Sequence, residues 1–144
     1  MKLSEHYTLE EATFSETALR KGIANVPDDA TLARMQITAI GMERVRSLLG
    51  YRIHVNSWLR NLLVNRAVGS KDSSDHVLGY AVDFTCPDYG TPLEICKTLV
   101  ASDVNFSQVI NEGRWVHIAF NPAKERSVLT AHFVNGQVTY TKGL

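Results

Sequence analysis

The stretch SSDHVLGYAVDF, residues 73–84, combines features that neither a plain buried strand nor a solvent-exposed loop requires. His76 precedes Asp83 by seven residues, and most of the residues between them are apolar. Gly79 permits a sharp turn after the histidine, from which the chain can enter a strand that presents Asp83 back toward His76. A buried carboxylate without a partner is costly, so Asp83 in this apolar setting indicates a specific partner.

A second histidine lies in a later apolar segment, Trp115–Phe120. On a strand, alternate side chains point to opposite faces of the sheet. Val116 and Ile118 would then face the core, and His117 would point to the opposite face beside Trp115. That face is a candidate floor for a binding cleft.

Two imidazole nitrogens and one carboxylate form a sensible ligand set for Zn²⁺, which keeps three protein ligands and one open position in catalytic sites. Zinc lowers the pKa of its bound water to about 7. Glu112, five residues before His117 across the Gly113-Arg114 turn, is the predicted general base and proton donor. His76 alone is typical of a hydrogen-bonded structural histidine, and His117 alone could lack a function. Their combination with Asp83 and Glu112 favours a hydrolytic centre.

The chain predicts a single α+β domain over residues 1–144, with a small antiparallel or mixed sheet and helices packed on one face. Periodicity and capping residues predict helices after Thr8, from Pro27 to Gly50, over 61–68 and after Thr91. The core face of the long helix is expected to carry Leu32, Met35, Ile40, Val45, Leu48 and Leu49. Strands are expected at 52–57, 80–85, 108–111 and 115–120, with a hairpin over 127–140 that turns at Asn135-Gly136. Residues 17–27 are expected to be irregular.

Composition excludes several classes of function. Fifteen basic residues balance fifteen acidic ones among 144 residues, so the chain lacks the basic character of a nucleic-acid-binding protein. The N-terminus has no apolar signal-peptide region, and no apolar run approaches the roughly 20 residues needed to span a membrane. We therefore expect synthesis in the cytoplasm. Cys86 and Cys96 are expected to be reduced core residues, with a metal role for Cys86 as the alternative.

The motif Ser74-x-His76-x-x-Gly79-x-Ala81-x-Asp83-Phe84, with Glu112 and Trp115-Val116-His117, resembles the zinc D-alanyl-D-alanine carboxypeptidase family. It is most similar to the short phage and prophage endolysin-type branch, which includes L-alanyl-D-glutamate peptidases and shares its fold with the Hedgehog signalling domain. The upstream segments 57–60 and 65–69 and the opening 3–9 extend the likeness over nearly the whole chain up to Phe120. Two differences are Asp75, where many relatives have Gln, and Trp58-Leu59 before Arg60, which is expected to reshape a cleft wall.

The resemblance implies that His76, Asp83 and His117 bind one Zn²⁺ per chain and that Glu112 is the catalytic base. It also implies that Arg60 orients or polarises the substrate, while Ser74 and Trp115 are expected to line the substrate site. The implied partner is a bacterial peptidoglycan stem peptide, and the implied setting is a monomer that reaches the cell wall after the membrane is permeabilised.

Several alternatives stay open from the sequence. The bond cut could be D-Ala-D-Ala, L-Ala-D-Glu or a cross-bridge bond, because the cleft walls set that choice. The protein could instead be a zinc-containing peptidoglycan-binding module without turnover, or a structural phage protein associated with the tail. In a third alternative, the histidines and Asp83 merely pack without a metal.

Overall fold

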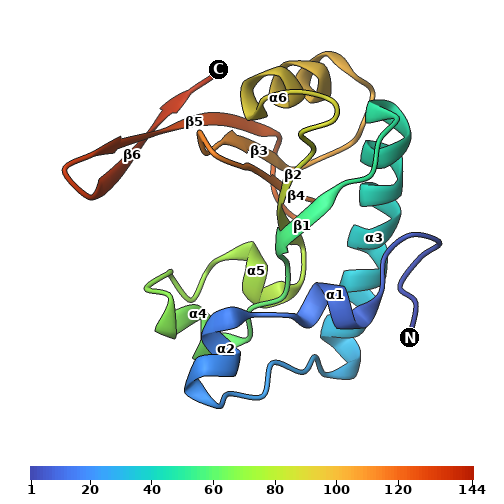
Figure 1. Cartoon of the computed structure of the whole chain (residues 1–144), viewed down its shortest axis with the longest axis vertical. Coiled ribbons are helices and arrows are strands. Elements are labelled where there is room, and N and C mark those ends of the chain that lie inside the picture. Colours follow the sequence, from blue (N-terminus) through green and yellow to red (C-terminus); the bar gives the residue numbers. More distant parts are fainter.

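A computed structural model describes all 144 residues and has a six-stranded mixed sheet at its centre, in the order β1-β2-β4-β3-β5-β6 (Figure 1). The strands are β1 (His54–Ser57), β2 (Ala81–Thr85), β3 (Gln108–Asn111), β4 (Val116–Ala119), β5 (Ser127–Val134) and β6 (Gln137–Lys142). Only β3 and β5 pair in parallel, and all other neighbours are antiparallel. This arrangement confirms the predicted α+β class.

Six helices accompany the sheet: α1 (Leu9–Thr13), α2 (Glu16–Lys21), α3 (Asp29–Leu49), α4 (Leu62–Ala67), α5 (Asp75–Leu78) and α6 (Pro92–Ala101). The caps explain where several of them begin. Asp28 caps α3, and Thr91 with Glu94 forms a complete capping box on α6. No helix is both long enough and apolar enough to cross a lipid bilayer.

The two faces of the sheet differ in what they carry. One face packs against α3 and α6 in the main core, where Phe84, Val109 and Ile118 are completely buried. The other face carries Asp83 and His117, which are direct cross-strand partners. Residues one position apart on a strand point to opposite faces, so this polar pair lies on the side away from α3. The sheet thus separates the core from the candidate site.

The β5–β6 hairpin projects from the far edge of the sheet, away from α3 (Figure 1). It turns at Asn135 and Gly136, both of which have positive φ, as a two-residue hairpin turn requires. All residues of β6 are exposed. The predicted hairpin and its turn are therefore confirmed.

Two structural predictions are wrong. Residues 17–27 are not wholly irregular, because Ser15 caps α2 and Gly22 ends it in a left-handed conformation. The long helix exists as predicted, but Ile40 and Leu48 are 56% and 38% exposed. The buried seam of α3 runs through Met35, Ala39 and Met42 instead, so these two apolar residues lie off the core face.

Candidate metal and active site

Asp83 and His117 are brought together by the pairing of β2 with β4. They are direct partners in the register, so their side chains share one face of the sheet. His117 Nδ1 lies 2.9 Å from Asp83 Oδ1. The strand alternation predicted from the sequence thus places both side chains as expected.

His76 reaches the same point from α5, a helix of four residues. Ser74 begins this helix by accepting a hydrogen bond from the His76 backbone N–H, and Gly79 ends it with a φ of 82°. A Cβ atom at position 79 would lie 2.6 Å from Met35 Cγ, so the turn needs glycine for space as well as for conformation. The sharp turn predicted after His76 is present, and the sequence reasoning missed only its short helix.

The donor set fits a metal ion. His76 Nδ1 lies 2.7 Å from the Trp58 carbonyl, which can only accept, so Nδ1 carries the proton and Nε2 keeps its lone pair. Nε2 is buried and has no hydrogen-bond partner, although it lies 3.3 Å from Asp83 Oδ2 without hydrogen-bonding geometry. One ligand atom from each of His76, Asp83 and His117 lies within 4.8 Å of the others. A histidine oriented through its other nitrogen by a carbonyl is typical of zinc ligands.

The charge on Asp83 is stabilised by the two histidines. Burial would raise the pKa of this carboxyl, but its interactions with the His76 and His117 imidazoles outweigh that effect and lower the pKa well below its usual range. Asp83 is therefore ionised at neutral pH, as a metal ligand must be.

Glu112 directly follows β3, and its backbone N–H donates to the Trp115 carbonyl at 3.1 Å. Glu112 is 8% exposed. Burial raises the pKa of Glu112, the charge of His117 lowers it, and the charge of Asp83 raises it further. The charges of two candidate ligands thus act on Glu112, and its raised pKa suits a proton-transfer group.

Burial lowers the pKa of the Arg60 guanidinium, and the charge of Asp83 opposes this shift. Its Nε is buried without a hydrogen-bond partner, and its backbone N–H donates to the His76 carbonyl at 3.1 Å. Arg60 lines a cavity of about 510 Å³ that also has His54 and Ser57 in its wall. A partly unsatisfied guanidinium beside an open cavity can receive a carboxylate or a carbonyl oxygen.

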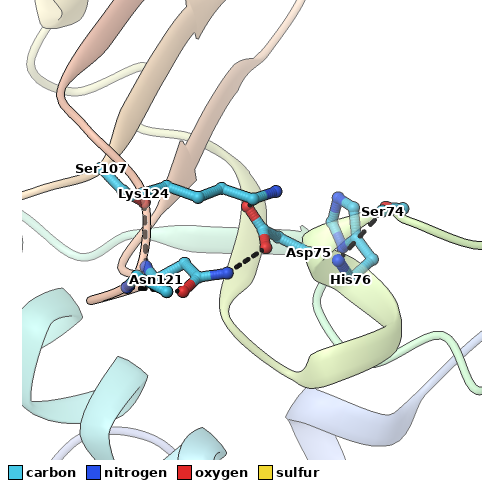
Figure 2. A network of polar contacts seen from close by, with 7 residues as sticks. Ser74, Asp75, His76, Ser107, Asn121 and Lys124 are labelled. Atoms are coloured by element: carbon cyan, nitrogen blue, oxygen red, sulfur yellow. Dashed lines mark hydrogen bonds and ion pairs between the residues drawn. The ribbon is translucent and has the colours of Figure 1, made fainter.

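A buried polar network holds α5 in place (Figure 2). Asp75, at 6% exposure, accepts a hydrogen bond of 2.9 Å from the Asn121 amide and pairs with Lys124 Nζ at 3.2 Å. Ser107 Oγ in turn accepts from the Asn121 backbone N–H at 2.9 Å. The network ties the residue before His76 to the loop that follows β4.

The remaining predicted site residues lie near the centre with different contacts. Ser74 acts as the cap of α5, and half-buried Trp115 lies in the turn just before β4, where its carbonyl accepts from the Glu112 backbone N–H. The expectation that Trp58 and Leu59 form a cleft wall is wrong, because both are buried at 0% and 2% exposure. Trp58 instead donates its indole N–H to the Gly79 carbonyl at 3.1 Å.

Sequence reasoning missed the supporting roles of Trp58, Asn121 and Lys124. The Trp58 contact with His76 uses a backbone carbonyl, which any residue could supply, so no sequence signal marks it. Asn121 was detectable in principle as a polar residue at the end of an apolar strand. Cys86 and Cys96 are buried free thiols, as expected, and neither belongs to the metal-ligand group.

Comparison with known proteins agrees with this geometry. Residues 5–119 match the family model described as Peptidase M15. The match includes all three candidate ligands, Glu112 and Arg60, and it ends before the β5–β6 hairpin. No curated protein matches the chain at a significant level. The chain therefore belongs to the peptidase M15 family, whose members are zinc-dependent peptidases.

Proposed function

We propose that this protein is a zinc peptidase that hydrolyses a peptide bond in the stem peptides of bacterial peptidoglycan. The observation that carries the proposal is the convergence of three ligand atoms within 4.8 Å, one of them the buried and unpartnered Nε2 of His76. A bound Zn²⁺ supplies a Lewis acid and an activated water at neutral pH. His76, Asp83 and His117 would hold that ion.

In this proposal, the carboxylate of Glu112 takes a proton from the attacking water and delivers it to the nitrogen of the leaving amine. Its raised pKa brings it closer to the operating pH, which favours both halves of this transfer. The Arg60 guanidinium binds the oxyanion that develops at the scissile carbonyl, or a carboxylate of the substrate. Arg60 is half-buried and lines a cavity, so its guanidinium can meet a substrate there.

The peptidoglycan substrate and the endolysin-type role belong to the proposal. They are supported by the motif likeness around His76 and by an acidic and a basic group, Glu112 and Arg60, on which the charge of Asp83 acts. All these residues come from one chain, so a monomer suffices. We propose that the protein acts at the cell wall once the membrane has been permeabilised.

Mass spectrometry of muropeptides after digestion of purified peptidoglycan tests the activity, the metal and the bond together. We expect new fragments that differ by hydrolysis of one peptide bond, and we expect a chelator to abolish them and added Zn²⁺ to restore them. Unchanged muropeptides with zinc-loaded protein would leave the alternative of a binding or tail-associated protein. Mass spectrometry of virions would then identify a structural role.

A further inference from the structure

The C-terminal hairpin continues the face of the sheet that holds the candidate ligands. Asp83 is opposite His117, His117 is opposite Ile110, Ile110 is opposite Leu129, and Leu129 is opposite Lys142. Direct partners in a sheet share a face, so this row reaches from the candidate ligands to the last strand. The β5–β6 hairpin lies outside the family match. The proposed reaction does not use the side chains on the face of the hairpin that continues the site.

The next row places Tyr140 in line with Glu112. Asn111 pairs with Thr130 and Tyr140 pairs with Ala131, so continuing the parallel register by one residue aligns Glu112, Ala131 and Tyr140. Ala131, on β5 between β3 and β6, is 8% exposed, while Tyr140 on the edge strand is 49% exposed. The Tyr140 ring is therefore half open to solvent on the side of the sheet where Glu112 lies.

The electrostatic surroundings of Tyr140 agree with this register. Partial burial raises the pKa of Tyr140, and the negative charges of Glu112 and Asp83 raise it further. This influence agrees with the face that the register assigns to Tyr140. Phe133 and Val138, a direct pair on this face, extend the apolar surface toward the hairpin tip.

We propose that Tyr140 is a substrate-contacting residue that binds an apolar part of the stem peptide, on the side of the scissile bond that faces β6. The proposal rests on the proposed function above. Adjacent strands are about 4.8 Å apart, so two strand spacings separate Tyr140 from Glu112 by about 10 Å. That distance corresponds to about three residues of an extended peptide. A stem peptide is long enough to reach Tyr140, whereas a dipeptide cut at the same centre is not.

The test compares Tyr140→Ala and Tyr140→Phe with wild type on a free stem peptide and on the shortest peptide that is still cleaved. We expect Y140A to lose about tenfold in kcat/KM on the stem peptide, through KM, because an aromatic contact is worth about that factor. Y140F should stay within about twofold of wild type. On the shortest peptide, all three proteins should be equal. Thr139→Ala, which alters the opposite face of β6, is the matched control and should behave as wild type.

Binding of the stem peptide to Glu112→Gln, with and without Y140A, provides a readout that needs no turnover. We expect Y140A to raise the dissociation constant of the stem peptide by about tenfold. If wild type cleaves the stem peptide and Y140A is equally active, the role of Tyr140 is refuted while the proposed function stands. The role of Tyr140 is also refuted if Y140A loses the same factor of kcat/KM on the stem peptide and on the shortest peptide. It is likewise refuted if Y140A loses activity only on intact, glycan-linked peptidoglycan. If wild type cleaves no peptide at all, the proposed function fails and this inference fails with it.

Discussion

His76 illustrates how a single side chain is prepared for its role. Its Nδ1 is occupied by the Trp58 carbonyl, and its Nε2 is left buried without a partner. A buried nitrogen without a hydrogen-bond partner lowers the stability of the fold by roughly 1–3 kcal/mol. A metal ion bound to this nitrogen would therefore add more stability than one bound at an exposed position. Glu112 has a different role from His76, because it is not one of the three candidate ligands. Burial raises its pKa, which suits proton transfer.

Replacing Glu112 by glutamine should separate metal binding from catalysis. Glu112 is not one of the three candidate ligands, so E112Q should keep one equivalent of zinc. Its peptidase activity should fall by about 10²–10⁴-fold, the usual contribution of a general base. Elemental analysis and a peptide cleavage assay measure the two effects. The control is Glu125→Gln at an exposed glutamate, and equal activity of E112Q and wild type would remove Glu112 from the mechanism.

The short helix α5 depends on its surroundings more than on its own length. Four residues form too few internal hydrogen bonds to be stable alone. Asp75 ties this helix to the loop after β4, and Gly79 fits it against Met35. The position of His76 is thus set by contacts that come from both earlier and later parts of the chain.

Replacing Asp75 by alanine should therefore loosen the whole helix. Loss of the buried carboxylate leaves the Asn121 amide without its acceptor, so we expect the free energy of unfolding to fall by about 2 kcal/mol. Zinc affinity should fall as well, because His76 loses its support. Urea denaturation and a competitive chelator titration measure these effects. Lys124→Ala removes the half-exposed member of the same network and should cost less than about 1 kcal/mol.

Over the whole molecule, the sequence predicted most elements and the convergence of His76, Asp83 and His117. Strong local signals were sufficient for α3, α6 and the hairpin turn, because caps and turn residues act within a few positions. The convergence of these three candidate ligands was predictable because His76 and Asp83 are close in sequence and His117 lies on an alternating strand. The strand order was not predictable, since the parallel pairing of β3 with β5 is a long-range contact. For the same reason, the partner of Asn121, which lies 46 positions away in the chain, and the alignment of Tyr140 with Glu112 could not be foreseen.

The N-terminal segment is fixed to the long helix by one carboxylate. Glu43 on α3 accepts hydrogen bonds from the Ser4 hydroxyl at 2.6 Å and the His6 backbone N–H at 2.7 Å, and it contacts His6 Nδ1 at 2.6 Å. Partial burial would raise the pKa of Glu43, but these hydrogen bonds lower it below its ordinary value of 4.5. The ionised carboxylate therefore stabilises the folded state.

Glu43→Gln should reveal this stabilisation through its pH dependence. Because the folded-state pKa is lowered, the contribution is complete above pH 4.5 and disappears as the pH falls through the lowered pKa. At neutral pH we expect E43Q to be less stable than wild type by about 1 kcal/mol, with the difference shrinking in acid. Urea unfolding of both proteins at several pH values measures this difference in the free energy of unfolding. Glu5→Gln, at an exposed neighbour, should show no such trend.

The meeting of Asp83 with His117 across β2 and β4 has a consequence for refolding. The two residues are 34 positions apart in the chain, so nothing local can assemble the chelating pair. Tight metal binding during refolding should therefore begin only when β2 pairs with β4 at the centre of the sheet. The rate at which a metal-sensitive dye loses its ion to the refolding protein would then measure the rate of that pairing.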